Sequence, residues 1–158
     1  MSVHKVKSLS ELKEIIDSLK KQGKKIGFTN GCFDLVHVGH IKYLRAAKKL
    51  ADILIVAINS DKSVKVLKGN KRPLFPQDER AEILSAFEFV DYVVIFDELD
   101  PEKTISALLP DILVKGGDYK IDQIIGKDTV ISHGGKVITV PEVNGKSTSE
   151  IIKKIIRS

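Results

Sequence analysis

The sequence predicts a doubly wound α/β fold, in which a parallel sheet of about five strands carries helices on both faces. Short apolar runs recur along the chain, and one of them, Ile-Leu-Ile-Val-Ala-Ile at residues 53–58, is typical of a parallel strand buried on both faces. Segments with apolar residues at helical spacing separate these runs. Strands that alternate with helices favour a parallel sheet with right-handed crossovers.

The strands are predicted from five of these apolar runs. Each run is short and is followed by a polar or glycine-containing segment, as expected where a buried strand ends. In a sheet of this kind, ligands bind beyond the carboxyl ends of the strands. The predicted strands are residues 26–29, 53–58, 92–96, 112–114 and 137–140.

Helix signals fill the segments between the strands. Ser8 or Ser10 can cap a first helix that the region of Gly23 ends, so residues 1–24 are expected to pack an N-terminal helix on the domain. Pro76 suits the start of a later helix, because its missing N–H is not needed in the first turn. Further helices are predicted over residues 37–50, 64–67, 101–109 and 151–156, the last of them amphipathic.

Length and composition limit the class of protein. A chain of 158 residues is most simply one domain, residues 1–158, and 42% hydrophobic with 30% charged residues excludes a disordered chain. No apolar run approaches the roughly 20 residues that cross a bilayer, and the N-terminus lacks the apolar core of a signal peptide. We therefore expect a cytoplasmic protein with no membrane partner, which agrees with its single cysteine, Cys32. The net charge of +5 is spread over scattered lysines, so no nucleic-acid partner is expected.

Two histidines, His37 and His40, follow the first predicted strand. Residues at i and i+3 share one face of a helix, and the first turn of a helix favours a phosphate group through its free N–H groups and its dipole. A surface or packing role and a zinc site are the alternatives. Zinc-binding helices usually space their ligands at i and i+4, and only Cys32 or the distant His133 could assist here. We therefore expect a phosphate site and no protein metal ligand.

Polar motifs also follow the other predicted strands. These motifs are residues 59–61, 115–119 and 144–149. Because parallel strands end at one edge of the sheet, the motifs are expected to meet the histidine pair there. Their convergence predicts a single site that binds a nucleotide.

These motifs resemble the signatures of the cytidylyltransferase-like nucleotidyltransferase superfamily, over nearly the whole chain. Within it, residues 29–34, 67–69 with 72–73, and 113–119 are most similar to the adenylyltransferase half of the bifunctional heptose-phosphate enzymes. The resemblance implies a Rossmann-like fold, and a stand-alone adenylyltransferase because no kinase half is found in this chain. The motifs that carry it are Gly31-Cys32-Phe33-Asp34, His37-Val38-Gly39-His40, the loop at Lys68, Gly116-Gly117-Asp118 and Ser147-Thr148-Ser149.

The resemblance implies a direct transfer, in which an oxygen of a sugar phosphate attacks the α-phosphorus of ATP and pyrophosphate leaves. The expected acceptor is D-glycero-β-D-manno-heptose 1-phosphate, and the expected product is ADP-heptose for lipopolysaccharide or surface glycan synthesis. Mg²⁺ is expected to bridge the phosphates, with water and substrate oxygens as its main ligands. Because related folds pair, a homodimer is also expected.

The resemblance also assigns roles to residues. His37, His40 and Lys68 are the expected catalytic residues, with both imidazoles doubly protonated against phosphate and Lys68 as a mobile positive charge. Arg72 and Lys115 are expected to bind the acceptor, and Gly39 to let the nucleotide approach the backbone. The full set of expected nucleotide-binding residues is Gly31, Cys32, Phe33, Asp34, Gly39, Gly116, Gly117, Asp118, Ser147, Thr148 and Ser149.

Two departures from the family pattern bear on the choice of substrate. Ser149 stands where the family usually has a second threonine, which retains the hydroxyl. Glu88 stands where the glycerol-phosphate branch has an arginine, which removes a phosphate-binding charge. The alternatives that remain are a cytidylyltransferase that acts on an alcohol phosphate such as glycerol 3-phosphate, and a non-catalytic nucleotide-binding module.

Overall fold

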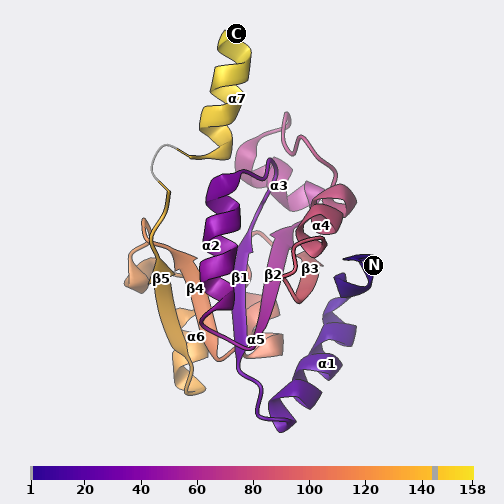
Figure 1. Cartoon of the computed structure of the whole chain (residues 1–158), viewed down its shortest axis with the longest axis vertical. Helices are drawn as coiled ribbons and strands as arrows, with labels where there is room; N and C mark the ends of the chain where they lie inside the picture. Colours follow the sequence, from indigo (N-terminus) through magenta and orange to yellow (C-terminus); the bar gives the residue numbers. More distant parts are fainter. Residues whose placement is uncertain (1, 144–145) are drawn as a thin grey trace.

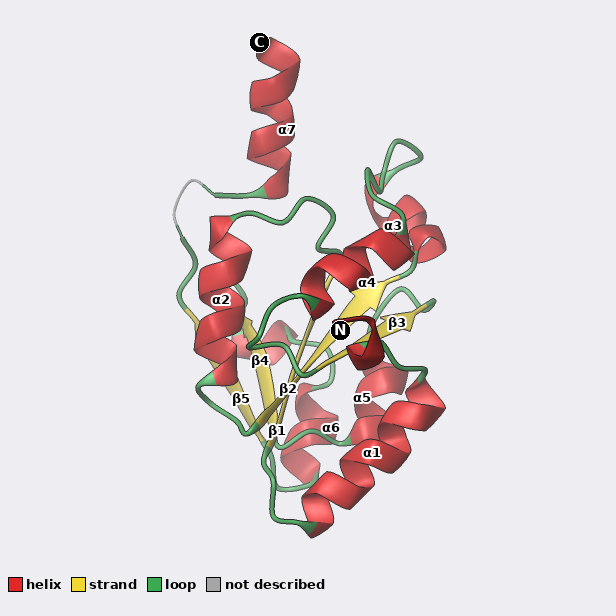
Figure 2. Ribbon diagram, turned by 45° about the vertical axis from the view of Figure 1, so that its right-hand side comes forward, coloured by secondary structure: helices red, strands yellow, loops and turns green. Residues whose placement is uncertain are grey.

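The computed structural model describes residues 2–143 and 146–158, which form a five-stranded parallel sheet between two layers of helices (Figure 1 and Figure 2). The strand order is β3-β2-β1-β4-β5, and each neighbouring pair is parallel. The predicted doubly wound α/β fold is confirmed. The strands are β1 (Ile26–Gly31), β2 (Ile53–Asn59), β3 (Tyr92–Phe96), β4 (Ile112–Gly116) and β5 (Lys136–Val140).

The helices lie between the strands, largely where the sequence predicts them. Ser8 caps the first helix in a capping box with Glu11, in which each side chain accepts a hydrogen bond from the other residue's backbone N–H. None of the helices in the described part of the chain is long and apolar enough to cross a membrane. The helices are α1 (Leu9–Lys21), α2 (Val38–Lys48), α3 (Asp61–Lys68), α4 (Gln77–Ser85), α5 (Glu102–Leu108), α6 (Lys127–Ser132) and α7 (Thr148–Arg157), with short 3-10 helices at Ser2–Lys5 and Ile121–Gln123.

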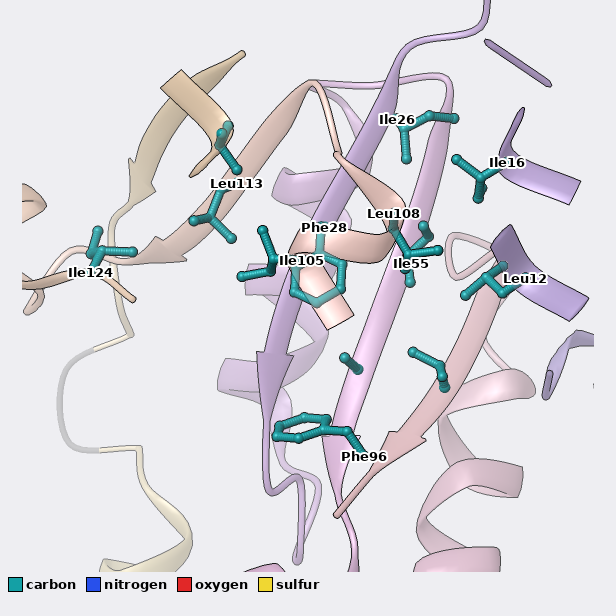
Figure 3. Close-up of a cluster of buried hydrophobic side chains, with 13 residues drawn as sticks. Leu12, Ile16, Ile26, Phe28, Ile55, Phe96, Ile105, Leu108, Leu113 and Ile124 are labelled. Atoms are coloured by element: carbon teal, nitrogen blue, oxygen red, sulfur yellow. The ribbon is translucent and has the colours of Figure 1, made fainter. Parts of the chain in front are cut away.

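Two hydrophobic cores lie on opposite faces of the sheet. One packs α1, α5 and α6 against the sheet, with Phe28 of β1 near its centre (Figure 3). The other packs α2 and α4 against the opposite face. Side chains alternate along β2, so that Ile55 and Ala57 enter the first core while Leu54, Val56 and Ile58 enter the second. Burial on both sides explains why this strand is apolar throughout.

Strand β1 is the point where the chain order of the sheet reverses, because β2 lies on one side of it and β4 on the other. Its register with β4 covers only Gly27 and Phe28, so the two strands part toward their carboxyl ends. The side chain of Tyr43 from α2 fills this fork. Its hydroxyl lies 2.7 Å from Thr29 Oγ1 and donates to the carbonyl of Val114 at 2.9 Å.

Helix α7 extends beyond the rest of the molecule (Figure 1). The prediction of a helix over residues 151–156 is confirmed, but none of the helix is buried within the described chain. Ile155 and Ile156 are 64% and 78% exposed. The start of α7 is tied to the body by Thr148, whose hydroxyl donates to the carbonyl of Leu35 at 3.0 Å.

Candidate active site

The two histidines form the cap of α2. His37 is the N-cap residue, and its Nδ1 accepts a hydrogen bond from the Gly39 N–H at 3.1 Å. His40 Nδ1 in turn accepts from the His37 N–H at 3.2 Å. Because a backbone N–H occupies each Nδ1, the proton of each neutral ring is on Nε2. The ring centroids are 3.9 Å apart, so the start of α2 presents two neighbouring Nε2–H donors.

The expectation of doubly protonated rings applies to bound phosphate and stays a prediction. In this structure neither ring is doubly protonated, because an Nδ1 that accepts a hydrogen bond cannot also carry a proton. The pKa values point the same way. Burial, with a contribution from His37, lowers the pKa of His40 to about 4, and burial together with Lys146 lowers the pKa of His37. Both rings are therefore neutral donors at neutral pH, and the N-terminal end of the helix dipole adds positive potential at the same place.

Phe33 supports the His40 ring from the loop after β1. Its ring centroid lies 5.1 Å from that of His40, and its side chain is buried. The backbone of Phe33 has a φ of 47°, in the left-handed region that costs a bulky residue about 1 kcal/mol or more. The fold retains this strained conformation at the point where it positions a histidine.

Gly39 makes room for the His37 ring. A Cβ at this position would lie 2.8 Å from His37 Cε1 and 2.9 Å from Nδ1, closer than side-chain atoms pack. Gly39 is expected to let a nucleotide approach the backbone. The structure adds a second reason for glycine here, because a side chain would collide with the capping imidazole of His37.

The histidines line a pocket of about 370 Å³ at the carboxyl edge of the sheet, a volume in the range of small-molecule sites. The ends of β1 and β4 and the starts of α2 and α7 meet there. Residues 144–145 of the last predicted motif lie outside the described part of the chain. The predicted site residues that line the pocket are Gly31, Cys32, Phe33, His37, Gly39, His40, Lys115, Gly116, Asp118, Ser147 and Thr148.

Asp34 and Arg72 are not among the lining residues, because they bind each other. Arg72 Nε donates to Asp34 Oδ2 at 2.6 Å, and the same carboxylate accepts from the N–H groups of Leu74 and Phe75. Burial opposes the charge on Asp34, but these hydrogen bonds and Arg72 outweigh it and hold the pKa of the carboxyl below its usual value. Asp34 thus holds the loop between α3 and α4 in place, and the guanidinium of Arg72 is already bound to the Asp34 carboxylate.

Lys68, Gly117 and Ser149 also lie outside the pocket wall. Lys68 is the last residue of α3 and is exposed, yet its positive charge acts on Cys32 in the pocket wall. Burial raises the pKa of the Cys32 thiol, and the charge of Lys68 opposes that rise. A Cβ on Gly117 would lie 3.4 Å from the Val140 carbonyl, so this glycine allows close approach to the end of β5. Ser149 is exposed on α7.

Comparison with known proteins identifies the family. Residues 28–154 match the family model described as Cytidylyltransferase-like. The chain belongs to this family. It is 55% identical over 154 residues to the Bifunctional protein HldE of Geobacter metallireducens and 53% identical to that of Geobacter sulfurreducens. Each match covers 98% of this chain but 31% of the relative, so the chain spans about a third of the length of these relatives.

Two solved structures are similar to this cytidylyltransferase-like chain. The crystal structure of the lipopolysaccharide core biosynthesis protein from Thermoplasma volcanium GSS1 is 30% identical with a TM-score of 0.62, and the match covers 78% of this chain and 99% of that one. Pantoate-beta-alanine ligase from Francisella tularensis is 18% identical with a TM-score of 0.64, covering 97% of this chain and 79% of the ligase. The second likeness concerns the fold alone.

The cytidylyltransferase-like pocket also contains residues that the sequence analysis did not assign to it. Tyr43 lies three residues after His40, and this helical spacing was a usable signal. Tyr119 and Lys146 lie within the predicted motifs 115–119 and 144–149 but had no role of their own, and Asn30 directly precedes the motif that begins at Gly31. Glu142 and Val143 had no signal. The lining residues to which the motifs gave no individual role are Asn30, Tyr43, Tyr119, Glu142, Val143 and Lys146.

Two carboxylates face each other across Gly116 in this pocket. A Cβ on Gly116 would lie 2.5 Å from Glu142 Oε1 and 3.0 Å from Asp118 Oδ1. Burial and the neighbouring Asp118 charge raise the pKa of Glu142. One side of the cytidylyltransferase-like pocket is therefore acidic, and the histidine side carries hydrogen-bond donors.

Proposed function

We propose that this chain is an adenylyltransferase, which transfers AMP from ATP to D-glycero-β-D-manno-heptose 1-phosphate and releases ADP-heptose and pyrophosphate. The observation that carries the proposal is the pair of Nε2–H donors at the start of α2, facing a nucleotide-sized pocket in a cytidylyltransferase-like chain. HldE relatives at 53–55% identity support the heptose branch, as does the likeness to a lipopolysaccharide core biosynthesis protein. The product would serve lipopolysaccharide or surface glycan synthesis.

The reaction needs no protein nucleophile. An anionic oxygen of the acceptor phosphate forms a bond to the α-phosphorus of ATP, and the bond from that phosphorus to the bridging oxygen of pyrophosphate breaks. His37 and His40 stabilise the charge that builds up on the α-phosphate through their Nε2–H groups, which are held in place before substrate binds. We assign the pyrophosphate part to Lys146, which lies beside His37, and to the start of α7, with Lys68 approaching from the end of α3.

We propose Mg²⁺ as the cofactor, arriving with ATP. Within residues 2–143 and 146–158, no group of three or more His, Cys, Asp or Glu side chains could hold a metal ion by itself. Of the lining side chains, Asp118 and Glu142 are the carboxylates, so the pocket fits an ion that keeps substrate oxygens and water as ligands. Such an ion neutralises charge on the triphosphate. Because ATP and Mg²⁺ are cytoplasmic solutes, we place the reaction in the cytoplasm.

The test is a panel of nucleoside triphosphates against phosphorylated sugars and alcohols, read by release of pyrophosphate in the presence of Mg²⁺. The proposal expects the highest kcat/KM with ATP and the heptose 1-phosphate. Turnover of CTP with glycerol 3-phosphate in place of this pair would support the cytidylyltransferase alternative. ATP binding without any turnover, unaffected by loss of both histidines, would support a non-catalytic module.

Replacing Gly39 by alanine is expected to lower kcat at least tenfold. The new Cβ would lie 2.8 Å from Cε1 of His37, so the imidazole must leave its capping position. Its Nε2–H then no longer points toward the α-phosphate. The same change in a His37→Ala background is the control, because the ring that clashes is then gone. Steady-state kinetics of the four proteins checks this, and additive losses would contradict the explanation.

We also propose a homodimer, with the exposed isoleucines of α7 covered by a second copy. Light scattering is expected to give the mass of a dimer for the parent protein. Joint replacement of Ile155 and Ile156 by lysine should shift the mass toward the monomer, whereas Lys153→Gln on the same helix should leave it unchanged. A monomeric parent protein would refute the proposal.

A further inference from the structure

A second cavity, which we call the α7 groove, lies between the start of α2 and one face of α7. Its volume is about 540 Å³, and it shares His37 and Lys146 with the candidate active site. The chain that leads into α7 passes close to the start of α2, since a Cβ on Gly39 would lie 3.4 Å from Lys146 Cβ. In Figure 1, α7 rises from the end of the molecule at which α2 begins. The groove therefore continues the candidate active site along α7.

Four cationic side chains line the α7 groove together with one carboxylate. Lys153 lies 3.5 Å from Glu150, but this pair is exposed to solvent and contributes little. Among the residues that the structure describes, no carboxylate lies within 4.0 Å of the side-chain nitrogens of Lys146, Lys154 or Arg157. The groove is thus a concentration of positive charge that the protein does not balance. The charged lining residues are Lys146, Glu150, Lys153, Lys154 and Arg157.

The helix dipole explains only part of this arrangement. Basic residues near the C-terminus of a helix offset the negative end of its dipole, which accounts for Lys154 and Arg157 in the last turn of α7. The dipole does not account for Lys146, which precedes the helix, or for the cavity that these cations share with His37. A ligand of negative charge in the groove accounts for both.

The cationic face of α7 is long and open. Its charged residues recur at i, i+3, i+4 and i+7 from Glu150 to Arg157, so they share one face that runs about 10 Å along the helix. Ile152, Ile155 and Ile156 recur at i, i+3 and i+4 on the other side of the helix. A second copy that covers these isoleucines therefore leaves the groove open. An extended anion fits the cationic face better than a single phosphate group does.

We propose that the α7 groove binds the distal part of a linear polyphosphate chain, so that the site takes donor nucleotides with more than three phosphate groups. This inference rests on the proposed function, which assigns the pyrophosphate part of ATP to Lys146 and the start of α7. Phosphate groups beyond the third extend along Lys154 and Arg157. The acceptor oxygen bonds to the α-phosphorus and the bond from that phosphorus to the bridging oxygen breaks, so a tetraphosphate donor releases tripolyphosphate in place of pyrophosphate.

Calorimetry with inorganic polyphosphates tests the groove without turnover. At a fixed concentration of free Mg²⁺, the Kd of tripolyphosphate is expected to be lower than that of pyrophosphate by about fivefold or more, because the longer anion reaches the α7 cations. The double variant Lys154→Gln/Arg157→Gln should abolish this preference, and Lys154→Gln alone should reduce it. The matched control is Lys24→Gln/Lys25→Gln, which removes two lysine charges from a cavity beside the start of β1 and should keep the preference.

Kinetics with adenosine 5′-tetraphosphate tests the chain when it is attached to a nucleoside. With the acceptor that is active in the panel, the KM of the tetraphosphate is expected to be lower than the KM of ATP by about fivefold or more, with tripolyphosphate as the product. Lys154→Gln/Arg157→Gln should bring the two KM values together, whereas Lys24→Gln/Lys25→Gln should keep their ratio. The ratio reports on the groove itself, since a loss of folded protein affects both donors alike.

The two proposals fail in different ways. A parent protein that releases no pyrophosphate with any pair of substrates would overturn the proposed function, and calorimetry with tripolyphosphate would still test the groove. Equal Kd values for tripolyphosphate and pyrophosphate, or equal KM values for the two donors in an active parent, would overturn the role of the groove alone. A preference that survives in Lys154→Gln/Arg157→Gln, or that the control loses equally, would overturn it too. Thermal melting and light scattering, expected to match the parent, confirm that folded proteins of the same mass are compared.

Discussion

Replacing His40 or His37 by alanine is expected to lower kcat by roughly 30- to 1,000-fold, equivalent to about 2–4 kcal/mol of barrier, with a much smaller change in the Kd of ATP. Each ring donates through Nε2, and its Nδ1 is fixed by a backbone N–H before any substrate binds. A donor held this way interacts most strongly with the charge that develops in the transition state. Rapid-quench kinetics and equilibrium binding of ATP measure the two effects separately.

Control variants separate the helix-capping role of His37 from its role as an Nε2–H donor. His37→Asn keeps a side chain that caps helices well but cannot place a proton where Nε2 carries it, so it should melt like the parent and still lose turnover. His133→Ala, at an exposed histidine after α6, should retain full activity. Equal losses in ATP binding and in turnover would contradict a role in the transition state.

Replacing Arg80 by methionine is expected to reduce the free energy of unfolding by about 3–5 kcal/mol. The guanidinium is fully buried and donates to the carbonyls of Phe75 at 3.0 Å, Cys32 at 2.7 Å and Asn59 at 2.8 Å. It also pairs with Asp61 Oδ1 at 2.9 Å. Methionine fills much of the volume but donates nothing, so buried carbonyl groups lose their partners.

Urea unfolding of Arg80→Met measures this loss. Arg45→Met is the control, because Arg45 is exposed on α2 and its guanidinium lies 5.2 Å from the Phe89 ring centroid, a contact worth about 1 kcal/mol or less. An Arg80→Met protein within 1 kcal/mol of the parent would mean that water replaces the lost donors. Activity is expected to fall as well, since Arg80 holds the carbonyl of Cys32 in the pocket wall.

The sheet could be predicted because its signals are local. Leu54, Val56 and Ile58 face one core and Ile55 and Ala57 the other, so β2 is recognisable from its apolar run alone. Strand β1 continues to Gly31, past its predicted end, because pairing with β2 extends to Ile58. Helix α6 was not predicted. It is short, and it begins after Gly126 with a φ of 91° and no side-chain cap, so the sequence carries little sign of it.

The site was predictable where motifs follow strands and unpredictable where distant segments pair. The topology alone places Gly116 and His37 in one pocket, since β1 and β4 end at the same edge. The Arg72 contact with Asp34 spans 38 residues, and the Lys115 contact with Asn30 spans 85. Such pairings depend on how loops return to the sheet, and composition and spacing hold no information about that.

In the proposed reaction, the imidazole cap connects the substrate to the backbone of α2 through each histidine ring. When an oxygen of the α-phosphate takes the Nε2–H bond, the ring is polarised and its Nδ1 becomes a stronger acceptor for the amide behind it. Negative charge that gathers on the phosphate is thereby shared with the amides of His37 and Gly39. In the proposed reaction, the backbone at the start of α2 therefore takes part in stabilising the α-phosphate through the two rings.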